Sequence, residues 1–105
     1  MAEATPNSEP SLCGFPVTRG PEANVDRVNL LTFLDQHKIG TRLLFAGNLT
    51  RQPYMIGRNY RVSGELTNTD RIMHDTLWIG VFPGLTKEMM DFSISKIEEF
   101  FGVNF

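Results

Sequence analysis

The chain has 105 residues and a formal net charge of −2, and 41% of its residues are hydrophobic. This length and composition predict one small globular domain, and the acidic balance argues against a nucleic-acid or membrane-surface binder, which would carry a basic stripe. No apolar run approaches the roughly 20 residues of a membrane span, the first residues do not resemble a signal peptide, and a single cysteine excludes an internal disulfide framework. We therefore expect a protein of the reducing cytoplasm.

The N-terminal part of the chain is predicted to lead into a strand. Residues 1–10 are polar and contain two prolines, so we expect a flexible lead-in before a single domain over 11–105. The run 12–18 is typical of a strand, and Pro16 favours the edge of a sheet because proline cannot donate a ladder hydrogen bond. Cys13 lies in this apolar run without an evident histidine partner, so we interpret it as a core thiol.

The next elements are predicted to be a helix and a second strand. The helix is expected at about 24–38, with Asn24 as its N-cap and Gly40 as its stop. Its apolar side chains recur at helical spacing: Val28, Leu30, Leu31 and Leu34. The run 41–45 then predicts a strand whose continuous apolar centre is more typical of a buried strand than of a surface element.

Shorter elements follow this strand. Asn48 is a suitable cap for a helical turn over 49–52, and residues 55–66 are interpreted as loop because they are rich in glycine, serine and arginine. A short helix is expected over 69–74, after a run of capping and turn-forming residues. The run 76–82 is the strongest strand signal in the chain.

The chain is predicted to end in a helix that begins after the cap Thr86 and stops at Gly102. Apolar side chains at spacings of 4, 3 and 4 define its buried face: Met90, Ile94, Ile97 and Phe101. The tail of the helix carries more apolar surface than one face can bury: Phe100, Phe101 and Phe105. We interpret this excess as the contact surface of a partner.

The order strand, helix, strand, short helix, strand, helix predicts an α/β (α+β) two-layer sandwich, with a small three-stranded sheet and helices packed against it. No complete catalytic set accompanies this fold. A metal site needs several clustered ligands, whereas Cys13, His37 and His74 are scattered singly, and no glycine-rich phosphate fingerprint is present. Three lysines lie on predicted helix surfaces rather than in a desolvated pocket: Lys38, Lys87 and Lys96. We therefore expect no catalytic, cofactor-binding or metal-binding residue in this chain.

The turn after the second strand has the chemistry of a binding site. Asn48 at a helix N-terminus would leave backbone N–H groups as a cradle for an anion, and Arg51 adds a guanidinium fork suited to phosphate or carboxylate. Gln52 and Tyr54 can form hydrogen bonds with a hydroxylated ligand. The alternative interpretation is a surface loop with ordinary capping.

Two stretches resemble the C-terminal domain of DegT-type sugar aminotransferases and dehydratases, which are vitamin B6 enzymes of the aspartate-aminotransferase fold. The first is residues 39–54, Ile-Gly-Thr-Arg-Leu-Leu-Phe-Ala-Gly-Asn-Leu-Thr-Arg-Gln-Pro-Tyr. The second is residues 68–73 followed by 78–86, in which Pro-Gly-Leu-Thr opens the last helix. The first stretch resembles one branch most closely, the 3-dehydratases that act on CDP-4-keto-6-deoxyglucose in bacterial lipopolysaccharide O-antigen biosynthesis. The resemblance covers nearly the whole chain and implies the small C-terminal domain of a fold-type I aminotransferase.

The resemblance also implies which parts of a complete enzyme are not contained in these 105 residues. A complete enzyme of this kind has a large N-terminal domain that holds pyridoxamine or pyridoxal phosphate. In the dehydratase branch a histidine replaces the coenzyme lysine, a [2Fe-2S] cluster is bound by cysteines of the large domain, and the enzyme is a homodimer served by a reductase. This domain would close one side of the nucleotide-sugar site and would be inactive alone. The positions carried over as facing the nucleotide-sugar are Arg42, Phe45, Asn48, Arg51, Gln52 and Tyr54.

Two alternatives stay open at this point. One is a stand-alone, non-catalytic module that binds a nucleotide-sugar or another protein. The other is the small domain of a sugar aminotransferase. The coenzyme segment of the large domain would distinguish the parents, since a lysine there implies transamination and a histidine implies dehydration.

Overall fold

The computed structural model describes residues 3–102. The elements in that range are β1 (Gly14–Thr18), α1 (Arg27–Gln36), β2 (Thr41–Leu43), η1 (Leu49–Arg51), η2 (Pro53–Met55), α2 (Thr67–Asp75), β3 (Thr76–Gly80) and α3 (Lys87–Phe101). The elements η1 and η2 are single turns of 3-10 helix. Every strand and helix expected from the sequence is present, and the differences lie in the ends and in what each element buries.

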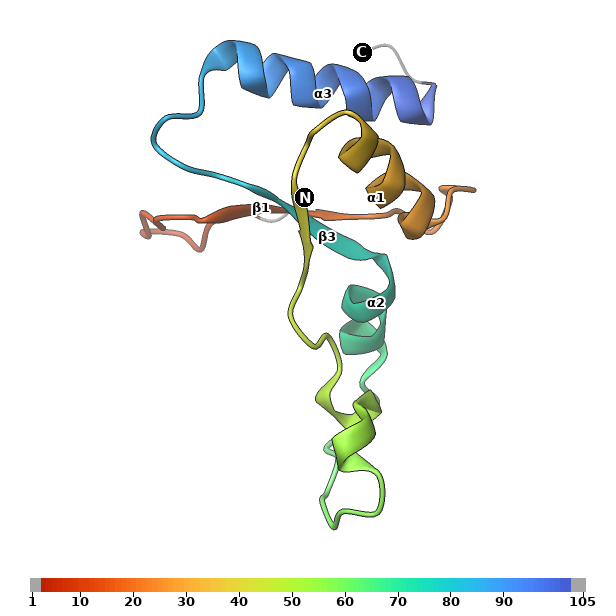
Figure 1. Cartoon of the computed structure of the whole chain (residues 1–105). Helices are drawn as coiled ribbons and strands as arrows, with labels where there is room; N and C mark the ends of the chain where they lie inside the picture. Colours follow the sequence, from red (N-terminus) through yellow and green to blue (C-terminus); the bar gives the residue numbers. More distant parts are fainter. Residues whose placement is uncertain (1–2, 103–105) are drawn as a thin grey trace.

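The three strands form an antiparallel sheet in the order β1-β3-β2. The strand β3 is the last in sequence but central in space, so Trp78 lies between Pro16 on β1 and Arg42 on β2. Pro16 is therefore on an edge strand, as expected. The helices α1 and α3 lie on one side of the sheet, and α2 extends from the other side (Figure 1). This architecture confirms the expected small α+β fold.

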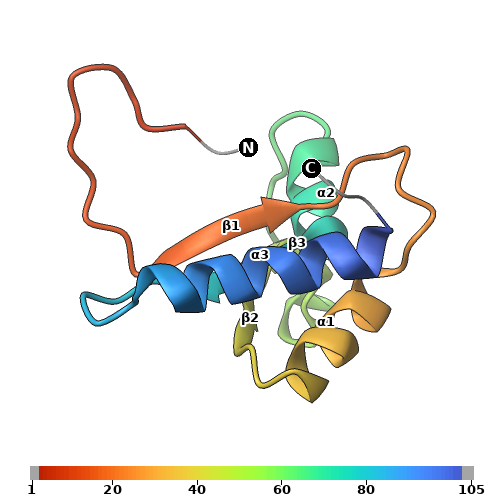
Figure 2. The same ribbon diagram turned by 90° about the horizontal axis from the view of Figure 1, so that it is seen from above.

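The core lies between the sheet and the helices α1 and α3. Its buried apolar residues within the described part of the chain are few: Leu30, Leu34, Ile39 and Leu77. Seen from above, α3 crosses the sheet and α1 lies beside its C-terminal half (Figure 2), where the rings of Phe33 and Phe100 are 5.2 Å apart. Each fully buried leucine contributes about 1.5–3 kcal/mol, so the stability of the fold depends on a small number of side chains.

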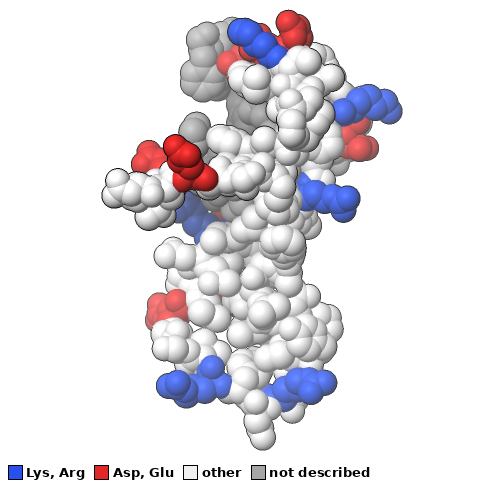
Figure 3. Space-filling model, turned by 90° about the vertical axis from the view of Figure 1, so that its left-hand side faces the viewer, with Lys and Arg blue, Asp and Glu red and all other residues white. Residues whose placement is uncertain are grey.

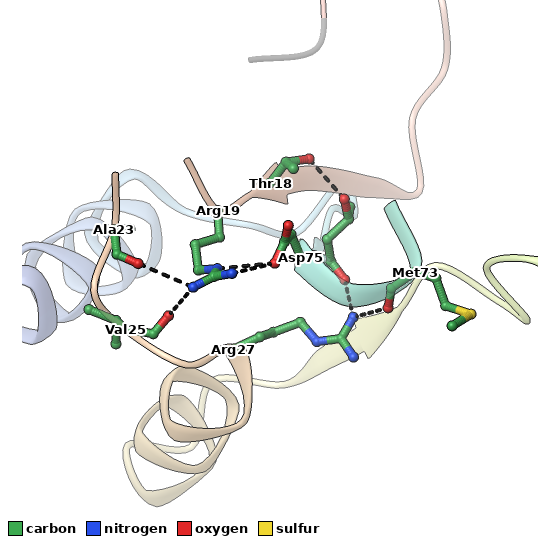
Figure 4. Close-up of polar contacts among 8 residues, drawn as sticks. Thr18, Arg19, Ala23, Val25, Arg27, Met73 and Asp75 are labelled. Atoms are coloured by element: carbon green, nitrogen blue, oxygen red, sulfur yellow. Dashed lines mark hydrogen bonds and ion pairs between the residues drawn. The ribbon is translucent and has the colours of Figure 1, made fainter. Parts of the chain in front are cut away.

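The start of α1 differs from the expected cap at Asn24. The Arg19 guanidinium explains this difference, because its Nη1 donates to the carbonyl oxygens of Ala23 (3.1 Å) and Val25 (3.0 Å). Its Nε and Nη2 donate to Oδ1 of Asp75 at 3.1 and 2.8 Å (Figure 4). The segment before α1 is thus held in an irregular turn by the side chain that directly follows β1, and the helix begins only after that turn.

The strand β2 is shorter and more exposed than expected. Leu43 is 47% exposed and Phe45, which follows the strand, is 83% exposed. The interpretation of 41–45 as a buried strand is therefore wrong. The reason is the strand order, because β2 pairs only with β3 and lies at an edge of the sheet.

Cys13 is exposed and lies just before β1. The expectation of a core thiol is therefore wrong. The buried neighbour is Gly14, against which the Trp78 indole packs, so the aromatic ring rather than the thiol fills the space at this end of the sheet.

The ends of α3 confirm two local predictions. Oγ1 of Thr86 accepts the N–H of Met89 at 3.3 Å, and Gly102 adopts the left-handed conformation with φ of 64° that glycine favours at a helix end. Within residues 3–102, no helix is long and apolar enough to cross a membrane.

The apolar excess of α3 lies at its start rather than at its tail. Phe100 and Phe101 pack against the core, and Phe105 lies outside the described residues. Side chains in the first half of the helix are between 43% and 53% exposed: Met89, Met90, Phe92 and Ile94. The expected buried face is therefore wrong for Met90 and Ile94, because the first half of α3 extends beyond α1 (Figure 2).

Residues 44–66, between β2 and α2, are called the arm below. The arm projects away from the sheet, and α2 leads back to it (Figure 1). The whole fold measures 50 × 36 × 24 Å with a radius of gyration of 16.2 Å, against about 13 Å for a compact domain of this length. Positions 44–64 hold three arginines and no acidic residue, and basic patches mark the lower end of the molecule (Figure 3).

Candidate functional site

The turn at the start of the arm is built around Asn48, which is only 2% exposed. Its Oδ1 accepts the backbone N–H of Thr50 at 3.0 Å and the Thr50 hydroxyl at 2.7 Å. Its Nδ2 donates to Oδ1 of Asp70 on α2 at 2.7 Å. Asn48 is thus the cap that the sequence predicts, and it also fastens the turn to a helix further along the chain.

Arg51 makes a second link between the arm and α2. Its Nε and Nη2 donate to the two carboxylate oxygens of Asp70 at 3.1 and 2.7 Å, which is the forked geometry that favours arginine in such pairs. The Arg51 guanidinium and the Asn48 amide together lower the pKa of the Asp70 carboxyl to about 2, because hydrogen bonds to the carboxylate favour its ionised form. The carboxylate therefore stays charged at any ordinary pH.

Gly47 and Gln52 fix the shape of the turn. Gly47 has a φ of 65°, and a Cβ atom at this position would lie 2.4 Å from Cγ of Met73. Nε2 of Gln52 donates to the carbonyl oxygen of Ala46 at 2.8 Å, which closes the loop on itself. The turn therefore approaches α2 as closely as a glycine permits.

The expected cradle of free N–H groups is not present at this turn. The N–H groups of Thr50, Arg51 and Gln52 donate to Oδ1 of Asn48, the carbonyl of Asn48 and the carbonyl of Leu49, respectively. A single 3-10 turn with its donors engaged in this way has no anion site, so that interpretation is wrong.

The predicted site residues fall into two groups. Arg42, Phe45 and Tyr54 are exposed, whereas the other three use side-chain atoms for contacts inside the protein: Asn48, Arg51 and Gln52. In this structure the first group is available to a ligand, and Asn48 and Gln52 shape the surface on which a ligand would lie. Arg51 does both, because its side chain is 60% exposed while it is paired with Asp70.

A hollow of about 300 Å³ lies beside the turn and is lined by Phe45 and Gln52 together with Arg27 and His74. Nη1 of Arg27 donates to the carbonyl oxygens of Met73 and Thr76, at 2.6 and 3.1 Å (Figure 4), and so offsets the negative end of the α2 dipole. A larger hollow of about 530 Å³ follows the outer edge of β1 and contains none of the six predicted residues. The smaller hollow is the better candidate, because two of the six predicted residues, Phe45 and Gln52, line it.

The open face of the sheet continues this surface. Trp78 lies on β3 between Pro16 and Arg42, on the opposite side from the core residue Leu77, since neighbouring side chains of a strand alternate. The Phe45 ring stands edge-on to the Trp78 ring, with centroids 5.3 Å apart and an interplanar angle of 70°. An aromatic corner therefore adjoins the turn.

A family model matches residues 1–98 of the chain, and its description is the DegT/DnrJ/EryC1/StrS aminotransferase family. The chain belongs to this family. The resemblance seen in residues 39–54 is thereby confirmed.

Two curated relatives refine the placement within the DegT family. The lipopolysaccharide biosynthesis protein RfbH of Salmonella typhimurium is 62% identical over 105 residues, which is all of this chain and 24% of RfbH. The dTDP-4-dehydro-2,6-dideoxy-D-glucose 3-dehydratase of Saccharopolyspora spinosa is 45% identical over 97 residues, which is 92% of this chain and 21% of that enzyme. The chain spans about a quarter of the length of these relatives.

Members of the DegT family use pyridoxal or pyridoxamine phosphate, and the described residues do not fit such a coenzyme. Nζ of Lys87 pairs with Asp91 at 2.5 Å and Nζ of Lys96 pairs with Glu99 at 2.6 Å, and Lys38 is exposed. None of these amines has the desolvated setting that activates a Schiff-base lysine. The chain's single cysteine cannot supply the set of thiolates that holds an iron–sulfur cluster, and residues 3–102 contain no group of three potential metal ligands.

Sequence reasoning misses two residues of this surface, Asp70 and Trp78. Asp70 lies in a run of capping residues, where it resembles an ordinary helix-start carboxylate, and only the fold brings it to Arg51. Trp78 lies in a strong strand signal, where it resembles a core residue. The position of Gly14 opposite the ring is visible only once the register of β1 and β3 is known.

Proposed function

We propose that this chain is the C-terminal domain of a nucleotide-sugar 3-dehydratase, in which it forms one side of the nucleotide-sugar site and is inactive alone. The observation that carries this proposal is the 62% identity to RfbH over the whole chain, together with the 45% identity to a sugar 3-dehydratase. The length of the chain supports the proposed inactivity, because the chain spans only 24% and 21% of these relatives and the resemblance places the coenzyme in a large N-terminal domain.

The proposed substrate is CDP-4-keto-6-deoxyglucose. Support for it comes from residues 39–54, which resemble the dehydratases of lipopolysaccharide O-antigen biosynthesis. The same segment forms the turn beside the hollow of about 300 Å³, so the residues that carry the resemblance also shape the candidate site.

The six predicted residues would have different roles in this site. We assign direct contact with the nucleotide-sugar to Arg42, Phe45 and Tyr54, which are exposed. Asn48 and Gln52 would hold the turn in place through their internal hydrogen bonds. Arg51 is 60% exposed even while it is paired with Asp70, so it can present positive charge to a ligand phosphate without leaving its partner.

The remainder of the parent protein would supply the coenzyme domain, with pyridoxamine phosphate and a [2Fe-2S] cluster. We propose a cytoplasmic homodimeric parent that receives electrons from a reductase. The exposed apolar side chains on the first half of α3 support a further protein surface next to this domain, since such patches on a monomer mark contact sites.

A titration of the isotope-labelled chain with CDP and a CDP-sugar, followed by NMR, tests the ligand-binding part. We expect chemical-shift changes confined to 41–54 and its contact residues on α2 and β3. No change at millimolar ligand would refute the assignment of this surface. Addition of pyridoxamine phosphate tests the proposal that the chain is inactive alone. A stoichiometric coenzyme spectrum with dehydratase turnover would refute this proposal.

A second candidate function is a stand-alone interaction module, which the same apolar surface of α3 favours. It predicts a stable complex through α3 and no response to nucleotides. The small domain of a sugar aminotransferase is the third candidate, and the coenzyme segment of the parent distinguishes it, since a lysine there implies transamination.

A further inference from the structure

Phe45 has a backbone conformation that is unusual for a bulky side chain. Its φ is 49°, in the left-handed region that residues with a large Cβ substituent rarely occupy. Its N–H donates to the carbonyl oxygen of Leu43 at 2.8 Å, and the N–H of Gly47 donates to the carbonyl oxygen of Leu44 at 3.1 Å. These bonds hold the chain in a tight reversal that directs an aromatic ring outward, where it is 83% exposed. Strained residues of this kind are concentrated at ligand sites.

The Trp78 ring is held flat against the backbone of β1. A Cβ atom at Gly14 would lie 2.7 Å from Cε3 and 2.9 Å from Cδ2 of the indole, so the ring occupies the space that any other residue would fill. The Phe45 ring meets it at 70°. The two rings therefore form a corner with one rigid side, Trp78, and one projecting side, Phe45.

A cation lies next to this corner. Arg42 is the cross-strand neighbour of Trp78, and it is exposed. Among residues 3–102, Arg42 takes part in no ion pair with a carboxylate. An aromatic platform beside an unpaired guanidinium matches a nucleotide, which has a planar base joined through its sugar to phosphate.

We propose that the corner formed by Phe45 and Trp78 is the subsite for the nucleobase of the nucleotide-sugar, with Arg42 placed to contact its phosphate. This inference rests on the proposed nucleotide-sugar site and assigns the parts of the ligand within it. The nucleobase stacks on the exposed Phe45 ring. Binding at this subsite therefore requires an aromatic base in the ligand and does not depend on which sugar is attached.

Trp78 is the only tryptophan of the chain, so its fluorescence reports directly on this corner. The chain is titrated with CDP and, separately, with ribose 5-phosphate, which has the phosphate but no base. We expect CDP to quench the emission and ribose 5-phosphate to leave it nearly unchanged. Equal quenching by both ligands would overturn the assignment of the base to this corner.

Two variants make the test specific. Phe45→Leu keeps an apolar side chain but removes the ring, and we expect it to weaken CDP binding about tenfold, in line with the usual contribution of one base stack, without changing the affinity for ribose 5-phosphate. Phe82→Leu is the matched control, because Phe82 is also exposed, at 55%, but lies on the loop after β3. It should bind CDP as the unmodified chain does. Arg42→Gln should weaken the binding of both CDP and ribose 5-phosphate, because both ligands carry a phosphate.

The outcomes separate this inference from the proposed function. If the Phe45→Leu chain binds CDP with unchanged affinity, and NMR shifts persist over 41–54, the base subsite is wrong while the nucleotide site stands. If neither fluorescence nor NMR detects CDP, the proposed function fails and the subsite fails with it. Because Phe45 is exposed, its replacement should leave the fold intact, and a far-ultraviolet spectrum of each variant checks this directly.

Discussion

Replacement of Gly47 by alanine tests how closely the turn after β2 is held against α2. The new Cβ atom would lie 2.4 Å from Cγ, 2.5 Å from Cβ and 2.9 Å from Cα of Met73. These distances are well inside van der Waals contact, and two of the three atoms cannot move without the backbone of α2. Alanine is also forced to adopt the φ of 65° that Gly47 has.

Two contributions give the expected magnitude. The left-handed conformation costs a residue with a Cβ atom about 1–2 kcal/mol, and overpacking against Met73 adds about 1–3 kcal/mol. Gly47→Ala should therefore lower the free energy of unfolding by about 2–5 kcal/mol. Gly57→Ala is the matched control, because Gly57 has a φ of 76° but no atom within 4 Å of the new Cβ. It should lose only the conformational part, about 1–2 kcal/mol.

Urea unfolding followed by Trp78 fluorescence measures both variants in the same way. The difference in free energy of unfolding between Gly47→Ala and Gly57→Ala isolates the contact of residue 47 with α2. Equal losses of stability in the two variants would refute the close approach of the turn to α2. Met73→Ala should not rescue Gly47→Ala, because Cβ and Cα of residue 73 remain in place. A full rescue would mean that the flexible end of the methionine, rather than the backbone of α2, limits the approach.

Three further predictions concern the core, the arm and the open face of the sheet. Leu34→Ala should lower the free energy of unfolding by about 2–5 kcal/mol, measured in urea, because Leu34 is fully buried. Folding lowers the pKa of Asp70 from 3.8 to about 2. The stabilisation from its hydrogen bonds is therefore complete above about pH 4 and is lost as the pH falls towards 2. NMR titration of the Asp70 carboxyl should give a midpoint of about pH 2, and Arg51→Ala should raise that midpoint. Gly14→Ala should change the emission maximum of Trp78, because the new Cβ would lie 2.7 Å from its Cε3, and an unchanged spectrum would contradict that packing.

Features that depend on a few neighbouring residues could be predicted from the sequence. Asn48 and Thr86 cap their helical turns as expected, and Gly102 ends α3 in the left-handed conformation. Pro16 lies on an edge strand. In each case the preference is set by the side chain and backbone of the residue itself, so distant parts of the fold do not change it.

Features that depend on distant contacts could not be predicted. The exposure of Leu43 follows from the order of strands in the sheet, and the exposed Cys13 lies beside Gly14, against which Trp78 packs; a linear pattern gives neither. The expected cap at Asn24 is displaced by Arg19, whose guanidinium also binds a carboxylate 56 positions away.

The candidate site shows the same division. Its chemistry was visible in the segment from Arg42 to Tyr54, but the roles of individual side chains were not. Arg51 has the fork expected of a ligand contact, and the structure places Asp70, 19 positions further along, within that fork. Phe45, predicted only through the family resemblance, is the residue whose backbone and exposure single it out most clearly.

The central place of β3 has a consequence for the order in which the fold forms. Thr18 and Thr76, whose hydroxyl oxygens are 2.9 Å apart, are separated by 58 positions. Because both β1 and β2 pair only with β3, neither has a strand to bind while a ribosome is still adding the residues before Thr76. The helix α1 can form early, since its contacts are local, but closing such long loops is slow. We therefore expect the whole sheet to assemble in one late step, and a nascent chain arrested before Thr76 to hold both edge strands without any sheet.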